Sequence, residues 1–335
     1  MLPYTPSTSR AFILCRGGGR IHRNWIGSLG REPVSMEHES ISSKNRIEIP
    51  PDSPCPCGSN NRMEDCCMTP DGRFQPPLCN TQPPLPITGY SHPSCYAASL
   101  GDCSPSISRE HYISAGLLHR LRKDPGGMIR VSGLAWAKDE KRVSVNSLAS
   151  KILCERHNNA LSPLDSIGVR IFDTIARIKS DFALRQDHDQ AFLFNGHDVE
   201  RWLLKTLCGI AMSGGLLDAN RERSDWKPDL PLLEMLFGLR SLPANCGLRC
   251  GAFEPGDHDE RNIEFTPHIS SDKKKLLATS FRMFPIRFIL VLEYPFEGMD
   301  IILPELQHHP ELVVFRAGDG KKVIMFRWND SSPVQ

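Results

Sequence analysis

Four cysteines crowd into a short run near one end of the chain. Residues 54–67 read PCPCGSNNRMEDCC, and Cys55, Cys57, Cys66 and Cys67 are their thiols. Zinc prefers four thiolate or imidazole ligands in a tetrahedron, and two short ligand clusters separated by a glycine turn let a short peptide wrap one ion. Two disulfides in a small secreted module are the alternative. Nothing else in the chain is typical of a secreted protein, so we predict a zinc knuckle with these four ligands.

This run resembles the SEC-C motif, known from the C-terminal zinc tail of the SecA translocase motor and from many otherwise unrelated bacterial proteins. In that motif Cys-Pro-Cys-Gly-Ser is followed, after six residues, by Cys and then by Cys or His. Here residues 60–65 fill the same interval between Ser59 and Cys66. The resemblance covers only this run. It implies an accessory zinc module that docks onto a protein partner.

Composition restricts the class of protein. The chain has 335 residues, of which 40% are hydrophobic and 24% charged, which is typical of a soluble protein with more than one folded unit. Its net charge is +1, so any contact with nucleic acid needs a local basic patch. Its cysteines cluster with histidines, which favours metal binding in a reducing compartment. No apolar run is long enough for a membrane helix. We therefore expect a cytoplasmic protein without membrane contact.

The N-terminal residues have a different character. Residues 1–35 carry five arginines and one acidic residue, together with a Gly17–Gly19 triplet. The only apolar run is too short for a secretory leader, although a transit peptide is an alternative. We expect residues 1–48 to be a disordered extension, and the sequence leaves open whether translation starts at Met1 or Met36.

A second group of metal-binding residue types lies further along. Cys154 and His157 have the spacing that places both side chains on the first turn of a helix, facing one ion. Cys95 and Cys103 are the nearest candidates for the other two ligands. We therefore predict a second zinc site. One interpretation is that its role is purely structural.

This second group, with the Glu110-His111 dipeptide between its two halves, resembles the HNH or ββα-metal endonuclease motif, which is built on a treble-clef zinc site. By that resemblance Glu110 is a ligand of a catalytic Mg²⁺ or Mn²⁺ ion, His111 is the general base, and Asn158 binds the same metal. His157 replaces a helix cysteine as zinc ligand. The central Asn of the motif has no secure counterpart, and Asn146 is the nearest candidate.

Two functions therefore stay open. A neutral histidine can deprotonate water for attack on a phosphodiester while a metal ion stabilises the growing charge, so the first is metal-dependent cleavage of DNA. The wide spacing of Cys95 and Cys103 and the long interval from His111 to Cys154 depart from the motif. The second function is a non-catalytic, zinc-stabilised adaptor with a degenerate HNH-like fold and a protein partner. The sequence does not specify an oligomeric state.

Helical patterns precede strand patterns in the remaining sequence, which favours an α+β fold. Ser162 and Pro163 predict a helix start, Asp198 a second and Pro231 a third. Residues 288–292, 312–315 and 323–328 predict strands, the last two in a hairpin. We expect a knuckle (49–70), a Pro-rich linker (71–93), an HNH-like treble-clef domain (94–180), and an antiparallel, strand-rich α+β domain without an assigned role (181–335).

Overall fold

The computed structural model describes most of the chain beyond residue 48 and two short segments before it. The described residues are 11–14, 35–39, 49–122, 127–184, 186, 188–218, 220–252, 263–270, 275–283, 286–296, 298–299, 306–317 and 320–328. Within them the fold is a mixed α+β arrangement of helices against antiparallel strand-rich sheets, so the predicted fold class is confirmed at this level.

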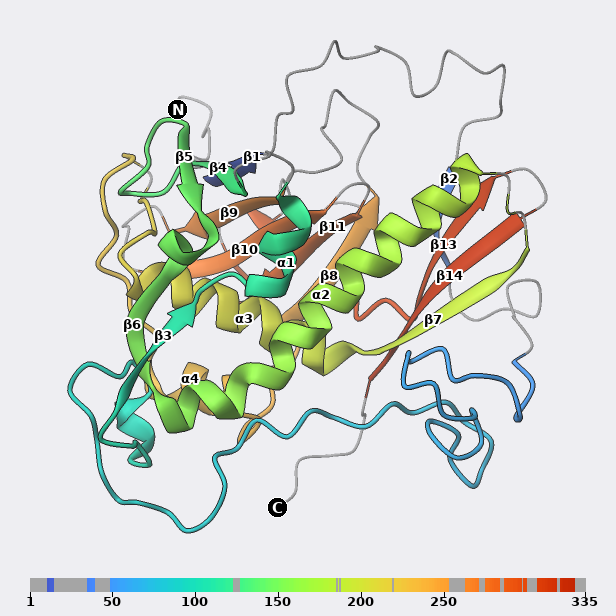
Figure 1. The fold of residues 1–335 in the computed structure, drawn as a ribbon, viewed down its shortest axis with the longest axis horizontal. Coiled ribbons are helices and arrows are strands. Elements are labelled where there is room, and N and C mark those ends of the chain that lie inside the picture. Colours follow the sequence, from blue (N-terminus) through green and yellow to red (C-terminus); the bar gives the residue numbers. More distant parts are fainter. Residues whose placement is uncertain are drawn as a thin grey trace.

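Three sheets surround the helices (Figure 1). The largest has eight strands in the order β12 (Gln307–His308), β8 (Gly247–Ala252), β11 (Ile286–Val291), β10 (Leu276–Met283), β9 (Ile263–Ile269), β1 (Ala11–Leu14), β4 (Met128–Ser132) and β5 (Lys141–Ser144). The second has four strands in the order β2 (Ser35–Glu39), β13 (Leu312–Ala317), β14 (Gly320–Arg327) and β7 (Gln190–Asn195). The third is the antiparallel pair of β3 (Ile107–His111) and β6 (Ala149–Cys154).

The two long helices form the centre of the molecule. Helix α2 (Glu155–Ala183) crosses the front of the view in Figure 1, from the β3–β6 pair to the four-stranded sheet. Helix α3 (Gly196–Met212) contacts both α2 and the eight-stranded sheet, and nearly all of its residues are buried. A Cβ on Gly168 of α2 would lie within 2.6 Å of the Trp202 ring, so only glycine permits this close helix crossing. The shorter helices are α1 (Ala115–Leu121) and α4 (Leu230–Leu236).

The predicted start of the first long helix is wrong. Helix α2 begins directly after Cys154, and Pro163 lies inside it. Proline cannot donate to the carbonyl four residues earlier, which belongs to Asn159. The hydroxyl of Ser162 donates to that carbonyl instead, at 2.9 Å. The Ser-Pro pair therefore continues a helix that it was predicted to begin.

The other local predictions agree better. Helix α3 starts two residues before Asp198, and α4 starts beside Pro231. Strand β13 covers its predicted segment, whereas β11 and β14 each end one residue before the predicted end. The hairpin of β13 and β14 is confirmed. One pair in this region, β14 with β7, is parallel, which the expectation of an antiparallel region did not include.

The predicted domain limits cut through continuous structure. The limit between residues 180 and 181 falls within α2, and one hydrophobic core contains residues from both sides of it, including Leu161 and Phe281. In the segment expected to be a disordered extension, β1 pairs with β4 and β9, and β2 pairs with β13. The rest of residues 1–48 lies outside the described residues. Local composition does not predict the pairing of these two strands, because their partners are distant in sequence.

None of the helices in the described residues has the length and apolar character needed to cross a membrane.

Candidate metal centres

The four cysteines of the knuckle lie together. The ligand atoms of Cys55, Cys57, Cys66 and Cys67 are all within 4.8 Å of one another. The Sγ atoms of Cys57 and Cys66 are 3.5 Å apart, and those of Cys66 and Cys67 are 3.7 Å apart. A tetrahedron with Zn–S bonds of about 2.3 Å has sulfurs separated by about 3.8 Å, so this group fits zinc.

Local backbone structure sets this geometry. Gly58 has a φ of +81° and donates to the Cys55 carbonyl at 3.0 Å, which turns the chain between the two ligand pairs. The amides of Cys66 and Cys67 both donate to the Met63 carbonyl at 3.2 Å. Hydrogen bonding from Cys67 lowers the pKa of the Cys57 thiol to about 4, so a thiolate is available at neutral pH.

The knuckle is packed against the four-stranded sheet. Its buried Met63 and cysteines share a hydrophobic cluster with Leu193, Val314 and Met325 of that sheet. The Leu193 amide donates to the Pro56 carbonyl at 3.0 Å. Arg170 of α2 donates to the carbonyls of Cys57 and, at 3.1 Å, of Leu193. The knuckle, which we expected to be an accessory module before a Pro-rich linker, is therefore packed against the rest of the fold.

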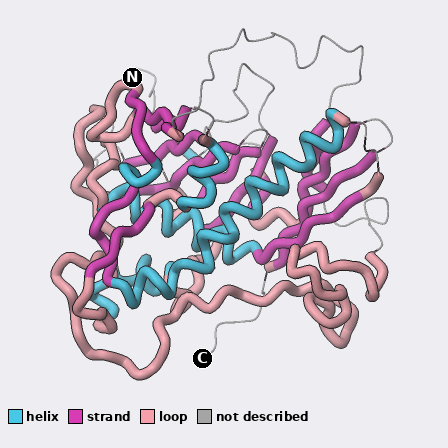
Figure 2. The backbone as a smooth tube through the Cα atoms, in the orientation of Figure 1, coloured by secondary structure: helices cyan, strands magenta, loops and turns pink. Residues whose placement is uncertain are grey.

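The segment after the knuckle is fixed as well. Figure 2 shows it as a long loop that follows one edge of the molecule towards β3. The Cys79 amide donates to Asp198 at 3.0 Å, Asn195 donates to the Pro76 carbonyl at 3.1 Å, and Arg201 donates to Thr81 at 2.8 Å. The start of α3 thus holds the segment that was expected to act as a spacer.

The second metal group joins two distant pieces of chain, the loop before β3 and the junction of β6 with α2. Cys95 and Cys103 lie on the loop before β3, Cys154 ends β6, and His157 lies on the first turn of α2. The Nδ1 atom of His157 is 3.6 Å from the Sγ atoms of Cys95 and Cys103, and 3.2 Å from that of Cys154. Tetrahedral zinc places sulfur and imidazole nitrogen about 3.5 Å apart, so these residues also fit zinc.

This group is sealed from solvent. All four side chains are buried, and the ring of Phe237 packs edge-on against His157 at 5.1 Å between centroids. Burial lowers the pKa of His157 to about 4, so its imidazole is neutral and able to bind a metal at pH 7. Among the described residues no cysteine forms a disulfide, in agreement with metal binding.

The wide spacing of the first cysteine pair has a structural explanation. A short 3₁₀ helix, η1 (Ala98–Leu100), lies between Cys95 and Cys103, and Gly101 follows it with a φ of +72°. This turn returns the chain to the site, so seven intervening residues place both thiols at one ion.

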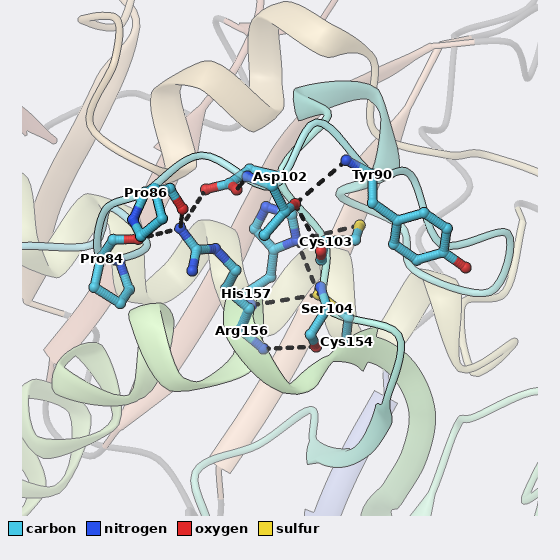
Figure 3. A network of polar contacts seen from close by, with 10 residues as sticks. Pro84, Pro86, Tyr90, Asp102, Cys103, Ser104, Cys154, Arg156 and His157 are labelled. Carbon is cyan, nitrogen blue, oxygen red and sulfur yellow. Dashed lines mark hydrogen bonds and ion pairs between the residues drawn. The ribbon is translucent and has the colours of Figure 1, made fainter.

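Polar contacts tie the second group to the Pro-rich segment (Figure 3). Arg156, which lies between the ligands Cys154 and His157, donates to the carbonyls of Pro84 and, at 2.8 Å, of Pro86. It also pairs with Asp102 at 3.0 Å. The Cys103 amide donates to the Tyr90 carbonyl at 2.8 Å. The metal group and the loop over it are therefore one network.

The residues predicted for catalysis lie on β3 and at the start of α2, in environments different from that of the metal group. Glu110 is buried in β3, and one of its carboxylate oxygens is 2.6 Å from Nζ of Lys205 on α3. His111 is half-buried, and burial lowers its pKa. Asn158 is half-buried on α2, next to His157. Sequence reasoning missed Lys205, which looks like an ordinary helix residue.

Comparison with models of known protein families finds no match for this chain, and neither the curated proteins nor the solved structures contain a match.

Proposed function

We propose that this protein binds two structural zinc ions and acts as a zinc-stabilised interaction protein rather than as an enzyme. The observation that carries the proposal is the closure of both ligand groups. Each offers four ligands at zinc-like separations, and seven of the eight side chains are buried. Structural zinc sites are closed in this way, whereas catalytic zinc keeps a position for water or substrate.

The order of elements around the second group supports an HNH-like treble clef. A loop with Cys95 and Cys103 precedes the antiparallel strands β3 and β6, Cys154 ends β6, and His157 lies on the first turn of α2. This order is the one that the resemblance implies. The SEC-C-like knuckle remains a resemblance in sequence, and its packing on the sheet favours a role in holding the fold.

Zinc content tests the proposal. Purified, reduced protein should contain two zinc ions per chain by elemental analysis, and Cys154→Ser and Cys57→Ser should each contain one. Cys208→Ser is a matched control, because this buried thiol lies in α3 outside both groups. Zinc content of one or none in the wild type would contradict the proposal.

A second candidate, metal-dependent cleavage of DNA, is favoured by one observation. His111 is half-buried, and burial lowers its pKa below the ordinary value of 6.5, so a neutral ring that could act as a general base is favoured at pH 7. If this candidate is right, supercoiled or linear DNA is cut in the presence of Mg²⁺ or Mn²⁺, and His111→Ala loses the cleavage while it keeps both zinc ions.

A further inference from the structure

A buried ion cluster lies where the HNH-like resemblance places its catalytic metal. Lys205 extends from α3 between two carboxylates: its Nζ is 2.6 Å from Glu110 and 2.7 Å from Asp165. The side chains of Lys205 and Glu110 are 3% and 5% exposed, whereas Asp165 is 34% exposed. The cluster therefore opens to solvent only on the Asp165 side.

Neighbouring groups fix this arrangement. The Ser114 hydroxyl donates to the same Asp165 oxygen at 2.7 Å, and the indole of Trp202 donates to Ser114 at 3.2 Å. Burial alone would lower the pKa of Lys205, but Glu110 and Asp165 raise it above its ordinary value, so the ammonium stays charged. Burial raises the pKa of Glu110 against the opposing effect of Lys205. At 2.6 Å the Lys205 ammonium and the Glu110 carboxylate are in direct ion-pair contact.

These residues do not fit a bound Mg²⁺ ion. Magnesium requires near-octahedral oxygen ligands and keeps several of its waters. Here the carboxylate that the resemblance assigns to the metal is buried against an ammonium group, which is a cation itself and offers no lone pair. A divalent ion at Glu110 would have to displace Lys205, and leaving a buried ammonium without its partner is costly.

We propose that the Lys205 ammonium takes the place of a divalent cation between Glu110 and Asp165, so that this chain carries a fixed internal charge where the HNH-like resemblance expects an exchangeable metal. Lys205 is then a structural cation that links β3, α2 and α3. The proposal does not depend on the role of the two zinc ions, which should be retained in every variant below.

Titration with Mn²⁺, followed by electron paramagnetic resonance on the zinc-loaded protein, tests it. At millimolar Mn²⁺, we expect no Mn²⁺ site at Glu110 in the wild type. Any Mn²⁺ that the wild type binds elsewhere should be bound equally well by Glu110→Gln. Lys205→Ala should gain one Mn²⁺ site, and adding Glu110→Gln should weaken that site at least about tenfold. Lys227→Ala, which removes an exposed lysine elsewhere, should gain no site.

Two results would overturn the proposal. One is Mn²⁺ binding to the wild type that Glu110→Gln weakens about tenfold or more. The other is a folded Lys205→Ala protein without a Mn²⁺ site. If Lys205→Ala does not fold, the stability of Lys205→Met, Glu110→Gln and the double variant decides: the double variant should recover part of the melting temperature that Lys205→Met loses, and additive losses would refute the pairing.

Discussion

The guanidinium group of Arg156 donates a hydrogen bond to the carbonyl of Pro86 at 2.8 Å, across 70 positions of sequence. Arg156 lies between two residues of the second candidate metal group, so the Pro-rich loop is hydrogen-bonded to the same turn of α2 that carries His157. A change in this turn of α2 should therefore be detectable as a change in the Pro-rich loop.

Arg156→Gln should loosen the loop without removing zinc. The variant loses the charged contacts to Asp102 and to the proline carbonyls, so the Thr88 amide, which donates to Asp102 at 2.7 Å, should exchange at least about tenfold faster. Hydrogen exchange followed by mass spectrometry measures this. Arg120→Gln is the control, since its partner Asp173 is a half-exposed residue away from the loop. Unchanged exchange at residues 83–90 would count against the coupling.

The two zinc groups should differ in how much structure they support. Cys154→Ser should unfold the β3–β6 pair and the start of α2, because its site joins the loop before β3 to the β6–α2 junction in the main core. Cys57→Ser should release the knuckle and also expose Leu193 and Met325, which pack against it. In small zinc modules, zinc binding contributes on the order of 10 kcal/mol to the free energy of folding, so both variants should be strongly destabilised. Near-ultraviolet circular dichroism and limited proteolysis distinguish the two variants. A Cys57→Ser protein with an unperturbed four-stranded sheet would show that the sheet does not depend on the knuckle.

Arg170→Met should detach the knuckle while its cysteines remain intact. The Arg170 guanidinium lies over the Phe194 ring at 4.2 Å and donates to carbonyls of both the knuckle and β7. Losing these contacts should cost about 2 to 3 kcal/mol of unfolding free energy. Denaturant titration gives the value, and cleavage within residues 49–75 reports release. Arg177→Met is the control: the Arg177 guanidinium lies farther from its ring, 5.8 Å from the Phe192 centroid, so its loss should lower the unfolding free energy far less.

Glu200 should make stability depend on pH in the acid range. Burial raises its pKa, but hydrogen bonds from His197 and His309, both at 2.9 Å, outweigh burial and hold the pKa at about 2. A folded-state pKa below the ordinary value of 4.5 means that the carboxylate stabilises the fold above pH 4.5. That stabilisation, about 3 kcal/mol, is lost as the pH falls from 4.5 towards 2.

Comparing the wild type with Glu200→Gln isolates this effect. The difference in unfolding free energy should be largest near pH 6 and should shrink as the pH approaches 2. A difference that does not change with pH would show that Glu200 acts by packing alone.

Sequence reasoning named the two groups of cysteine and histidine side chains that the structure brings together, because parts of each group are closely spaced in the chain. Cys57 and Cys66 are 9 positions apart, and Cys154 and His157 are 3 positions apart at the start of α2, so a short stretch of chain contains each of these pairs. The same reasoning misplaced the start of α2. The Ser162-Pro163 pair has the composition of a helix start, and only the contact with Asn159 shows that it continues a helix.

The sequence by itself determined which residues can bind zinc, the α+β class and the C-terminal hairpin, since these follow from ligand chemistry and short-range periodicity. Only the tertiary structure decided what surrounds those ligands. Lys205 meets Glu110, and Arg170 meets Cys57, across long stretches of chain, because helix packing around one core brings their backbones together. Such pairings depend on the whole fold, so the environment of Glu110, and with it the fit to a divalent metal, could not be predicted from the motif.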